Sequence, residues 1–161
     1  EKLKEIPDVE FLELDVSAIY DPDRFACVLE QCIEREEELL RLGKTVCCYT
    51  TRKLLVADSE DKEEHLRLSV KISQAVQDLV GKLKVTPAFI IAKGGITSSD
   101  IGVKALKVKK AMVMGQIQPG VPVWELGPES TFPGVPYVIF PGNVGAEDTL
   151  KKAVAILKEQ E

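Results

Sequence analysis

The sequence predicts an α/β fold in three layers, with a mostly parallel sheet, some mixed pairing and helices on both faces. Short apolar runs that suit buried strands alternate with longer amphipathic segments through the first two thirds of the chain. That order is typical of parallel sheets, whose strands are joined by helical crossovers. Shorter strands follow one another closely near the C-terminal end, which favours antiparallel or mixed pairing there.

Two strands and two helices are predicted in the first half of the chain. Asp21 is a suitable N-cap with Pro22 at the first helical position, and Gly43 is a typical helix stop. Acidic residues open the second helix, where they complement the positive end of the helix dipole. The predicted elements are strands over 10–14 and 45–50 and helices over 21–44 and 58–83.

The second half contains the strongest strand signal, the apolar run "AFIIA", followed by three further strands. Prolines near the last two of these strands indicate sheet edges or strand starts, because proline donates no hydrogen bond to a neighbouring strand. An amphipathic helix closes the chain. The predicted elements are strands over 88–92, 111–117, 121–126 and 136–140 and helices over 98–108 and 146–160.

The composition is that of an ordinary globular domain. The chain has 161 residues and a formal net charge of -5, with 45% hydrophobic residues, so we expect one domain over 1–161. An acidic chain lacks the basic face of a general nucleic-acid binder. No apolar run approaches the roughly 20 residues that cross a bilayer. We therefore expect a cytoplasmic protein with no nucleic-acid and no membrane partner.

The cysteine and histidine positions do not favour a metal site. None of the four cysteines, Cys27, Cys32, Cys47 and Cys48, forms a C-x-x-C pair, and His65 is the only histidine. We expect buried free thiols and a solvated histidine, and no metal ligands. A metal-dependent aldolase or hydrolase is disfavoured for the same reason.

The stretch "FIIAKGGITSSD" ends a predicted strand in two glycines. Gly94 and Gly95 permit backbone dihedrals that a Cβ would forbid, and they let a ligand approach bare amides. Ligands of parallel α/β sheets bind beyond the carboxyl ends of the strands, and amides at a helix N-terminus favour phosphate. Thr97 or Ser98 is the predicted cap of the following helix, and Thr97 with Asp100 resembles a capping box.

By itself this motif is also compatible with a tight strand-to-helix turn that binds nothing. It matches neither the P-loop pattern nor the dinucleotide-binding pattern. Lys93, directly before the glycines, is either a phosphate ligand or a solvated surface lysine.

A second loop, "VIFPGNVGAED", repeats the order of strand, glycine turn and helix. Gly142 and Gly145 supply the turn, and Asn143 adds a donor and an acceptor. Glu147 and Asp148 in the first helical turn would repel phosphate. We expect this loop to contact the sugar or base of a ligand, the alternative being the ordinary start of a helix.

A third turn carries Thr50 and Thr51 at the end of a predicted strand. Their hydroxyls would either bond a ligand or cap a turn. If all these strands share one parallel sheet, the three turns lie at the same edge and converge on one pocket.

The blocks "GGIT", "PGVP" and "PGNVG" occur in that order between Phe89 and Asp148. This arrangement resembles the C-terminal nucleotide-binding domain of the four-carbon acid sugar kinase family, also called DUF1537. Those enzymes phosphorylate threonate, erythronate and 3-oxo-tetronate sugars with ATP. The resemblance runs over most of the chain.

The resemblance implies a set of ATP-binding positions at the three turns. Many family members carry an acid where this chain has Ile96, so Ile96 is expected to contribute only its backbone amide. The implied ATP-binding residues are Thr51, Gly94, Gly95, Ile96, Thr97, Gly142, Asn143 and Gly145.

The resemblance further implies that the chain is the C-terminal part of a larger kinase that uses ATP and Mg2+. A separate N-terminal domain would bind the acid sugar, so the chain alone is expected to be inactive, and no residue here is assigned as catalytic. A homodimer is compatible with the family. The alternatives are a non-catalytic nucleotide or phosphosugar-binding module and an interaction domain without a ligand.

Overall fold

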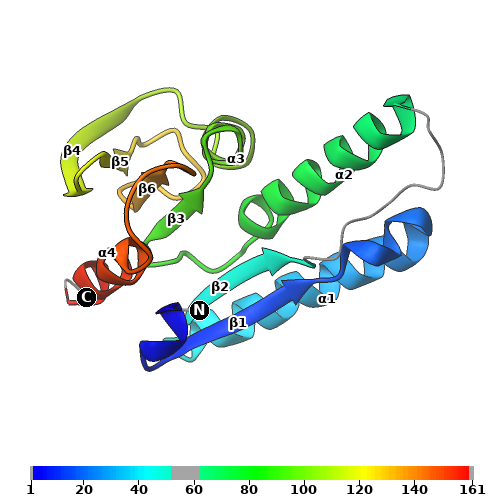
Figure 1. Cartoon of the computed structure of the whole chain (residues 1–161), viewed down its shortest axis with the longest axis horizontal. Coiled ribbons are helices and arrows are strands. Elements are labelled where there is room, and N and C mark those ends of the chain that lie inside the picture. Colours follow the sequence, from blue (N-terminus) through cyan, green and yellow to red (C-terminus); the bar gives the residue numbers. More distant parts are fainter. Residues whose placement is uncertain (1, 52–61, 160–161) are drawn as a thin grey trace. The chain divides into compact units, whose positions relative to one another are not determined.

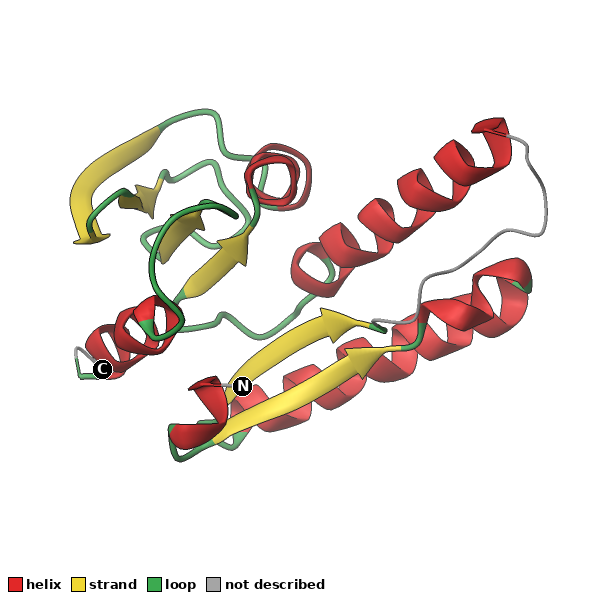
Figure 2. Cartoon of the chain, in the orientation of Figure 1, coloured by secondary structure: helices red, strands yellow, loops and turns green. Residues whose placement is uncertain are grey.

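The computed structural model describes residues 2–51 and 62–159, and these form two compact units (Figure 1). The N-terminal unit is Glu10–Val85, and the C-terminal unit is Thr86–Glu161 together with Glu1–Val9. The predicted α/β class is confirmed, with mixed pairing as expected. The strands fall into two sheets instead of one, in the orders β1-β2 and β3-β6-β5-β4 (Figure 2).

The N-terminal unit is a strand–helix–strand–helix arrangement. Figure 2 shows β1 and β2 pointing the same way, as the crossover through α1 requires. The start of the predicted helix over 58–83 lies outside the described residues. The elements are β1 (Val9–Leu14), η2 (Val16–Tyr20), α1 (Pro22–Arg41), β2 (Thr45–Thr50) and α2 (Lys62–Gly81).

The predicted signals at both ends of α1 are confirmed. The Asp21 carboxylate accepts a hydrogen bond of 3.1 Å from the backbone N–H of Arg24, and Pro22 occupies the first helical position. At the other end Gly43 adopts a φ of 71°, and its N–H donates to the carbonyl of Leu40 over 3.0 Å. This left-handed glycine ends the helix and turns the chain into β2.

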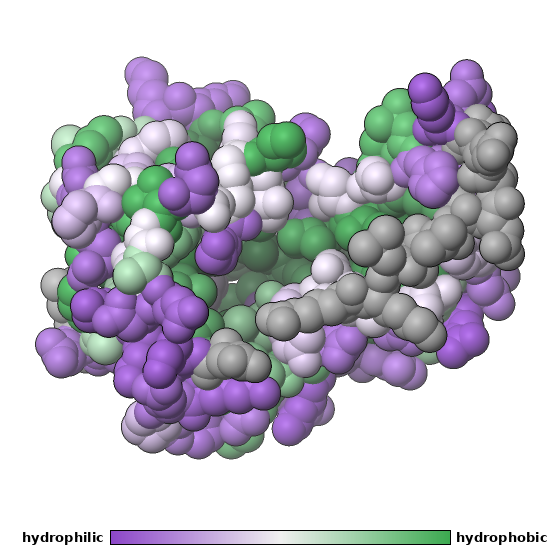
Figure 3. Space-filling model, viewed as in Figure 1, coloured by the Kyte–Doolittle hydropathy of each residue, from purple (hydrophilic) through white to green (hydrophobic). Residues whose placement is uncertain are grey.

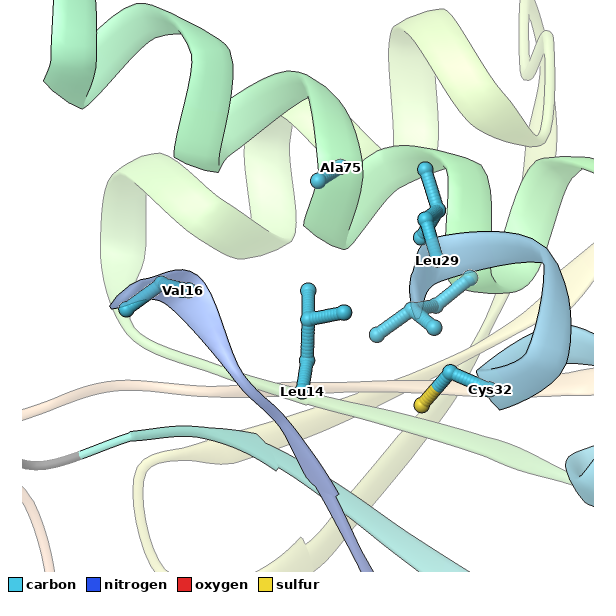
Figure 4. Packing of buried hydrophobic residues seen from close by; sticks show 6 residues of the cluster. Leu14, Val16, Leu29, Cys32 and Ala75 are labelled. Carbon is cyan, nitrogen blue, oxygen red and sulfur yellow. The ribbon is translucent and has the colours of Figure 1, made fainter. Parts of the chain in front are cut away.

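The core of the N-terminal unit lies where β1, α1 and α2 meet (Figure 4). Leu14 of β1 is completely buried, and α1 and α2 each present an apolar stripe towards it. The buried residues of this cluster are Leu14, Val16, Leu29, Cys32, Ala75 and Leu79.

The C-terminal unit is built on the four-stranded sheet. β3 pairs in parallel with β6, whereas β5 pairs antiparallel with both β6 and β4. Pro136 opens the central strand β6, a strand start as predicted. The elements are η1 (Lys2–Glu5), β3 (Ile90–Lys93), α3 (Gly95–Asp100), the π-helical turn η3 (Ile101–Ala105), β4 (Ala111–Gln118), β5 (Val121–Leu126), β6 (Pro136–Phe140) and α4 (Thr149–Lys158).

Helices cover both faces of this sheet, as predicted. Along β6, Val138 and Phe140 pack in one cluster with Leu157 of α4. Tyr137 faces the other side, where its hydroxyl bonds to Ser98 of α3. Because successive strand residues point to opposite faces, α3 and α4 lie on opposite sides of β6.

The described residues contain no helix long and apolar enough to cross a membrane. Hydrophilic side chains occupy much of the visible surface (Figure 3).

One carboxyl group of the N-terminal unit is buried without full pairing. Glu36 of α1 is 8% exposed, and its Oε2 atom has no hydrogen-bond partner. Burial raises the pKa of Glu36 to about 7, the nearby charge of Glu37 adds to the rise, and a hydrogen bond with the Cys48 thiol opposes it. The neutral form is therefore the one that the fold favours.

We predict that Glu36→Gln stabilises the chain at pH 8 by about 3 kcal/mol relative to wild type. The raised pKa in the folded state makes wild-type stability fall as pH rises from the ordinary value of 4.5 through about 7. The difference should vanish at pH 4. Thermal unfolding followed by circular dichroism at several pH values measures it, with the exposed Glu34→Gln as control. Equal pH profiles for wild type and Glu36→Gln would contradict the prediction.

Candidate functional site

The turn between β3 and α3 requires glycine at its first position. Gly94 has a φ of 109° and a ψ of 136°, a conformation that L side chains rarely adopt. Its N–H donates a 2.8 Å hydrogen bond to the carbonyl of Phe140, the last residue of β6. Gly94 thus extends the β3–β6 pairing by one bond before the chain turns into the helix.

The first helical amides follow directly. The first bond of the helix runs from the Ser98 N–H to the Gly94 carbonyl over 2.9 Å. The N–H groups of Gly95, Ile96 and Thr97 precede that bond, so they have no acceptor within the helix. They are the main-chain donors that the sequence assigned to a phosphate.

The predicted capping of this helix is wrong. The helix begins at Gly95 instead of residue 98, its N-cap is Gly94, and no side chain caps it. Ser98 lies within the first turn and is 1% exposed, and its hydroxyl donates back to the Gly94 carbonyl over 2.8 Å. Thr97 also lies inside the helix. The helix begins three residues earlier than predicted because Gly94 itself adopts the non-helical N-cap conformation.

Tyr137 fixes the helix on the sheet, a role that the sequence analysis did not assign. Its hydroxyl donates a buried 2.6 Å hydrogen bond to the Ser98 carbonyl. A Cβ built on Gly102 would lie 3.3 Å from the Tyr137 ring, so a small residue lets η3 approach the ring closely. The sequence signal was present in the alternation of β6, where Tyr137 falls on the opposite face from Val138.

The loop after β6 lies beside the Gly94 turn. A Cβ built on Gly142 would be 3.9 Å from the Gly94 Cα atom. Gly142, Asn143 and Gly145 are all exposed. The predicted convergence of these two loops is therefore confirmed.

The backbone conformation at position 145 requires glycine. Its φ is 90°, and an added Cβ would lie 2.7 Å from the Thr149 side chain. The Thr149 hydroxyl accepts a 2.7 Å hydrogen bond from the Ala146 N–H at the start of α4. Gly145 therefore shapes the loop, whether or not it also contacts a ligand.

Thr51 belongs to the other unit. Its hydroxyl accepts from the Val16 N–H over 3.3 Å and donates to the Leu14 carbonyl over 3.2 Å, so it ties the ends of β1 and β2 together. It also lines a small cavity of about 210 Å³ together with Thr50 and His65, which is exposed as predicted.

The expected convergence of all three turns at the edge of one sheet is wrong for Thr51. β2 pairs with β1, whereas the partner of β3 is β6 from the far end of the sequence. The parallel edge shared by Gly94 and Gly142 therefore comes from β3 and β6 alone.

The charges around the two loops are mostly paired. Asp100 of α3 forms an ion pair with Lys104 at 2.9 Å, and Asp148 pairs with Lys152 at 2.8 Å. The hydrogen bond from Lys152 is the main reason why the pKa of Asp148 lies below its ordinary value. Within residues 2–51 and 62–159, no three histidine, cysteine or acidic side chains gather as metal ligands.

We predict that Gly94→Ala destabilises the C-terminal unit by about 1–2 kcal/mol, because alanine is strained at a positive φ. Gly95→Ala is the matched control: a Cβ there meets nothing within 4 Å, and alanine is the better helix former. It should be neutral or slightly stabilising. Urea unfolding of both variants tests the difference, and equal stabilities would show that the φ of Gly94 imposes no constraint.

Comparison with known proteins agrees with this architecture. A family model described as a nucleotide-binding C-terminal domain matches residues 1–150. A search of curated proteins found no match.

Several solved structures share the fold. A DUF1537 protein from Bordetella bronchiseptica, a domain-swapped dimer with bound citrate, has a TM-score of 0.64 at 19% identity and aligns with 94% of this chain and 35% of its own. A Haemophilus influenzae DUF1537 protein gives 0.65 at 21% identity, with 97% and 37% covered. A Salmonella typhimurium LT2 protein described as a tRNA synthase gives 0.63 at 18% identity, with 90% and 34% covered.

The chain therefore spans about a third of the length of these solved proteins. The family model covers far more than half of the chain, and the resemblance seen in the "GGIT", "PGVP" and "PGNVG" blocks is confirmed. The chain belongs to the family of nucleotide-binding C-terminal domains and shares its fold with DUF1537 proteins.

Proposed function

We propose that the chain is the ATP-binding domain of a kinase that transfers the γ-phosphate of ATP to a hydroxyl of a four-carbon acid sugar. One observation carries the proposal: in a chain of the nucleotide-binding family, Gly94 and Gly142 lie side by side beyond the carboxyl ends of two parallel strands. That is where α/β sheets bind their ligands.

In this proposal the phosphates of ATP bind to the N–H groups of Gly95, Ile96 and Thr97. Gly142, Asn143 and Gly145 line the sugar or base side. The absence of side chains at Gly95 and Gly142 leaves the space that a nucleotide needs, because a Cβ at Gly95 would project into open space. Thr51 lies in the other unit, and its hydroxyl already bonds to the end of β1 and to the start of η2.

Mg2+ accompanies ATP in this proposal as a partner of the phosphates. The carboxylates of Asp100 and Asp148 already form ion pairs with lysines, so in this proposal the ion is held by the phosphates and not by these two side chains. Phosphoryl transfer depends mainly on positioning and on neutralising the phosphate charge, and the turn contributes fixed main-chain donors to both. The acid sugar would be held by a part of the protein outside this chain, so the chain alone binds ATP without turnover.

The assembly and location of the whole protein are also proposals. A homodimer is supported by the domain-swapped dimer of the Bordetella bronchiseptica protein. A reducing cytoplasm fits the free state of all four cysteines.

We predict that Gly95→Val abolishes ATP binding and leaves the fold intact. Gly95 is exposed, and its Cβ would contact no atom of the chain within 4 Å, so the isopropyl group would occupy only the space in front of the amides. Titration calorimetry of the 161-residue chain with ATP and MgCl2 measures the affinity. Circular dichroism checks the fold.

Ser99→Val is the matched control, because it places the same side chain on the exposed surface one turn further along α3. It should bind ATP like wild type. Unchanged affinity in Gly95→Val would refute the site. Normal ATP binding in the longer protein without transfer to any acid sugar would favour the non-catalytic binding module.

A further inference from the structure

Lys93 lies at the edge that carries both glycine loops, and its ammonium group forms no ion pair with a carboxylate of the described residues. Lys93 is the last residue of β3, is exposed, and directly precedes Gly94. Three other lysines of the same unit, Lys104, Lys151 and Lys152, each pair with an acid.

The register of the sheet fixes the side from which Lys93 approaches this edge. Lys93 pairs with Phe140 across the parallel β3–β6 ladder, and its Nζ lies 5.6 Å from the centre of the Phe140 ring. Phe140 packs in the cluster that contains Leu157 of α4. The Lys93 ammonium therefore lies on the α4 side of the sheet.

The chain passes over that same side as it runs from β6 through Gly142 to α4. The amides of Gly95, Ile96 and Thr97 belong to α3, which covers the opposite side. An anion seated above Gly94 and Gly142 would thus have main-chain donors on one side and the Lys93 ammonium on the other. The weak contact between the Lys93 ammonium and the Phe140 ring is easily exchanged for a phosphate oxygen.

The residue that follows the glycines carries no charge. Ile96 is 82% exposed. An apolar side chain there adds no negative charge near an incoming phosphate. The positive charge at this turn comes from Lys93 and the helical amides.

We propose that Lys93 is the cation that binds the phosphates of the nucleotide at this site, and that it selects phosphorylated nucleotides over the nucleoside. The inference rests on the proposed function, and it adds the residue that supplies the positive charge. The flexible stem and point charge of a lysine suit contact with successive phosphate oxygens.

The test compares ATP, ADP and adenosine as probes, by titration calorimetry of the 161-residue chain in MgCl2. Lys93→Met keeps the length and the apolar stem and removes the charge. It should weaken ATP and ADP binding by about tenfold, the usual scale for a charge-assisted contact, and leave adenosine binding unchanged. The fall in ATP affinity with added salt should also become less steep.

Lys93→Arg restores the charge and should recover wild-type affinity within a few fold. Lys109→Ala is the matched control, because Lys109 is exposed and precedes β4 at the opposite edge of the sheet. It should leave all three affinities unchanged.

Equal ATP affinity in Lys93→Met and wild type would overturn the role of Lys93 while leaving the proposed function in place. An equal loss of adenosine and ATP binding would also overturn it, because a lost charge cannot weaken binding of an uncharged nucleoside. If the wild-type chain binds none of the three probes, the proposed function is overturned, and the role of Lys93 with it.

Discussion

The parallel pairing of β3 with β6 is the constraint on which the C-terminal unit depends. These strands are far apart in the sequence, yet their last residues, Lys93 and Phe140, stand opposite one another. The hydrogen bond from the Gly94 N–H to the Phe140 carbonyl continues the ladder into the turn. Because parallel strands end at the same edge, this pairing brings the two glycine loops together.

The glycines at this edge serve two different physical purposes. Gly94 and Gly145 have positive φ values, so the backbone path itself requires them. Gly95 and Gly142 have no such requirement. A Cβ at Gly95 would meet nothing within 4 Å, and one at Gly142 would make only an ordinary contact of 3.9 Å with the Gly94 Cα atom. At the positions of the second kind, the fold itself does not require glycine.

The N-terminal unit has its own core and its own polar features. Leu14 and its neighbours close the contact between β1, α1 and α2. Thr51 uses both hydrogen-bonding capacities of its hydroxyl to join the ends of the two strands. Burial raises the pKa of Glu36, since an isolated charge there would lack the solvation of water.

The sequence by itself determined most of the elements and both ends of α1. The Asp21 cap, the Gly43 stop and the runs that became β2, β5 and β6 are local signals, because they depend on hydrogen bonds and packing within a few residues. The glycine loops and their place after strands were visible in the same way. The family blocks then indicated the type of domain.

Tertiary structure decided which strands pair and therefore which loops meet. The separation of β2 from the sheet of β3 and β6, and with it the place of Thr51, depends on contacts between distant residues that no local pattern encodes. The same holds for Tyr137 on the Ser98 carbonyl and for Lys93 beside the Phe140 ring. Periodicity assigns a residue to a face, but the partner across that face is set only when the whole sheet has assembled.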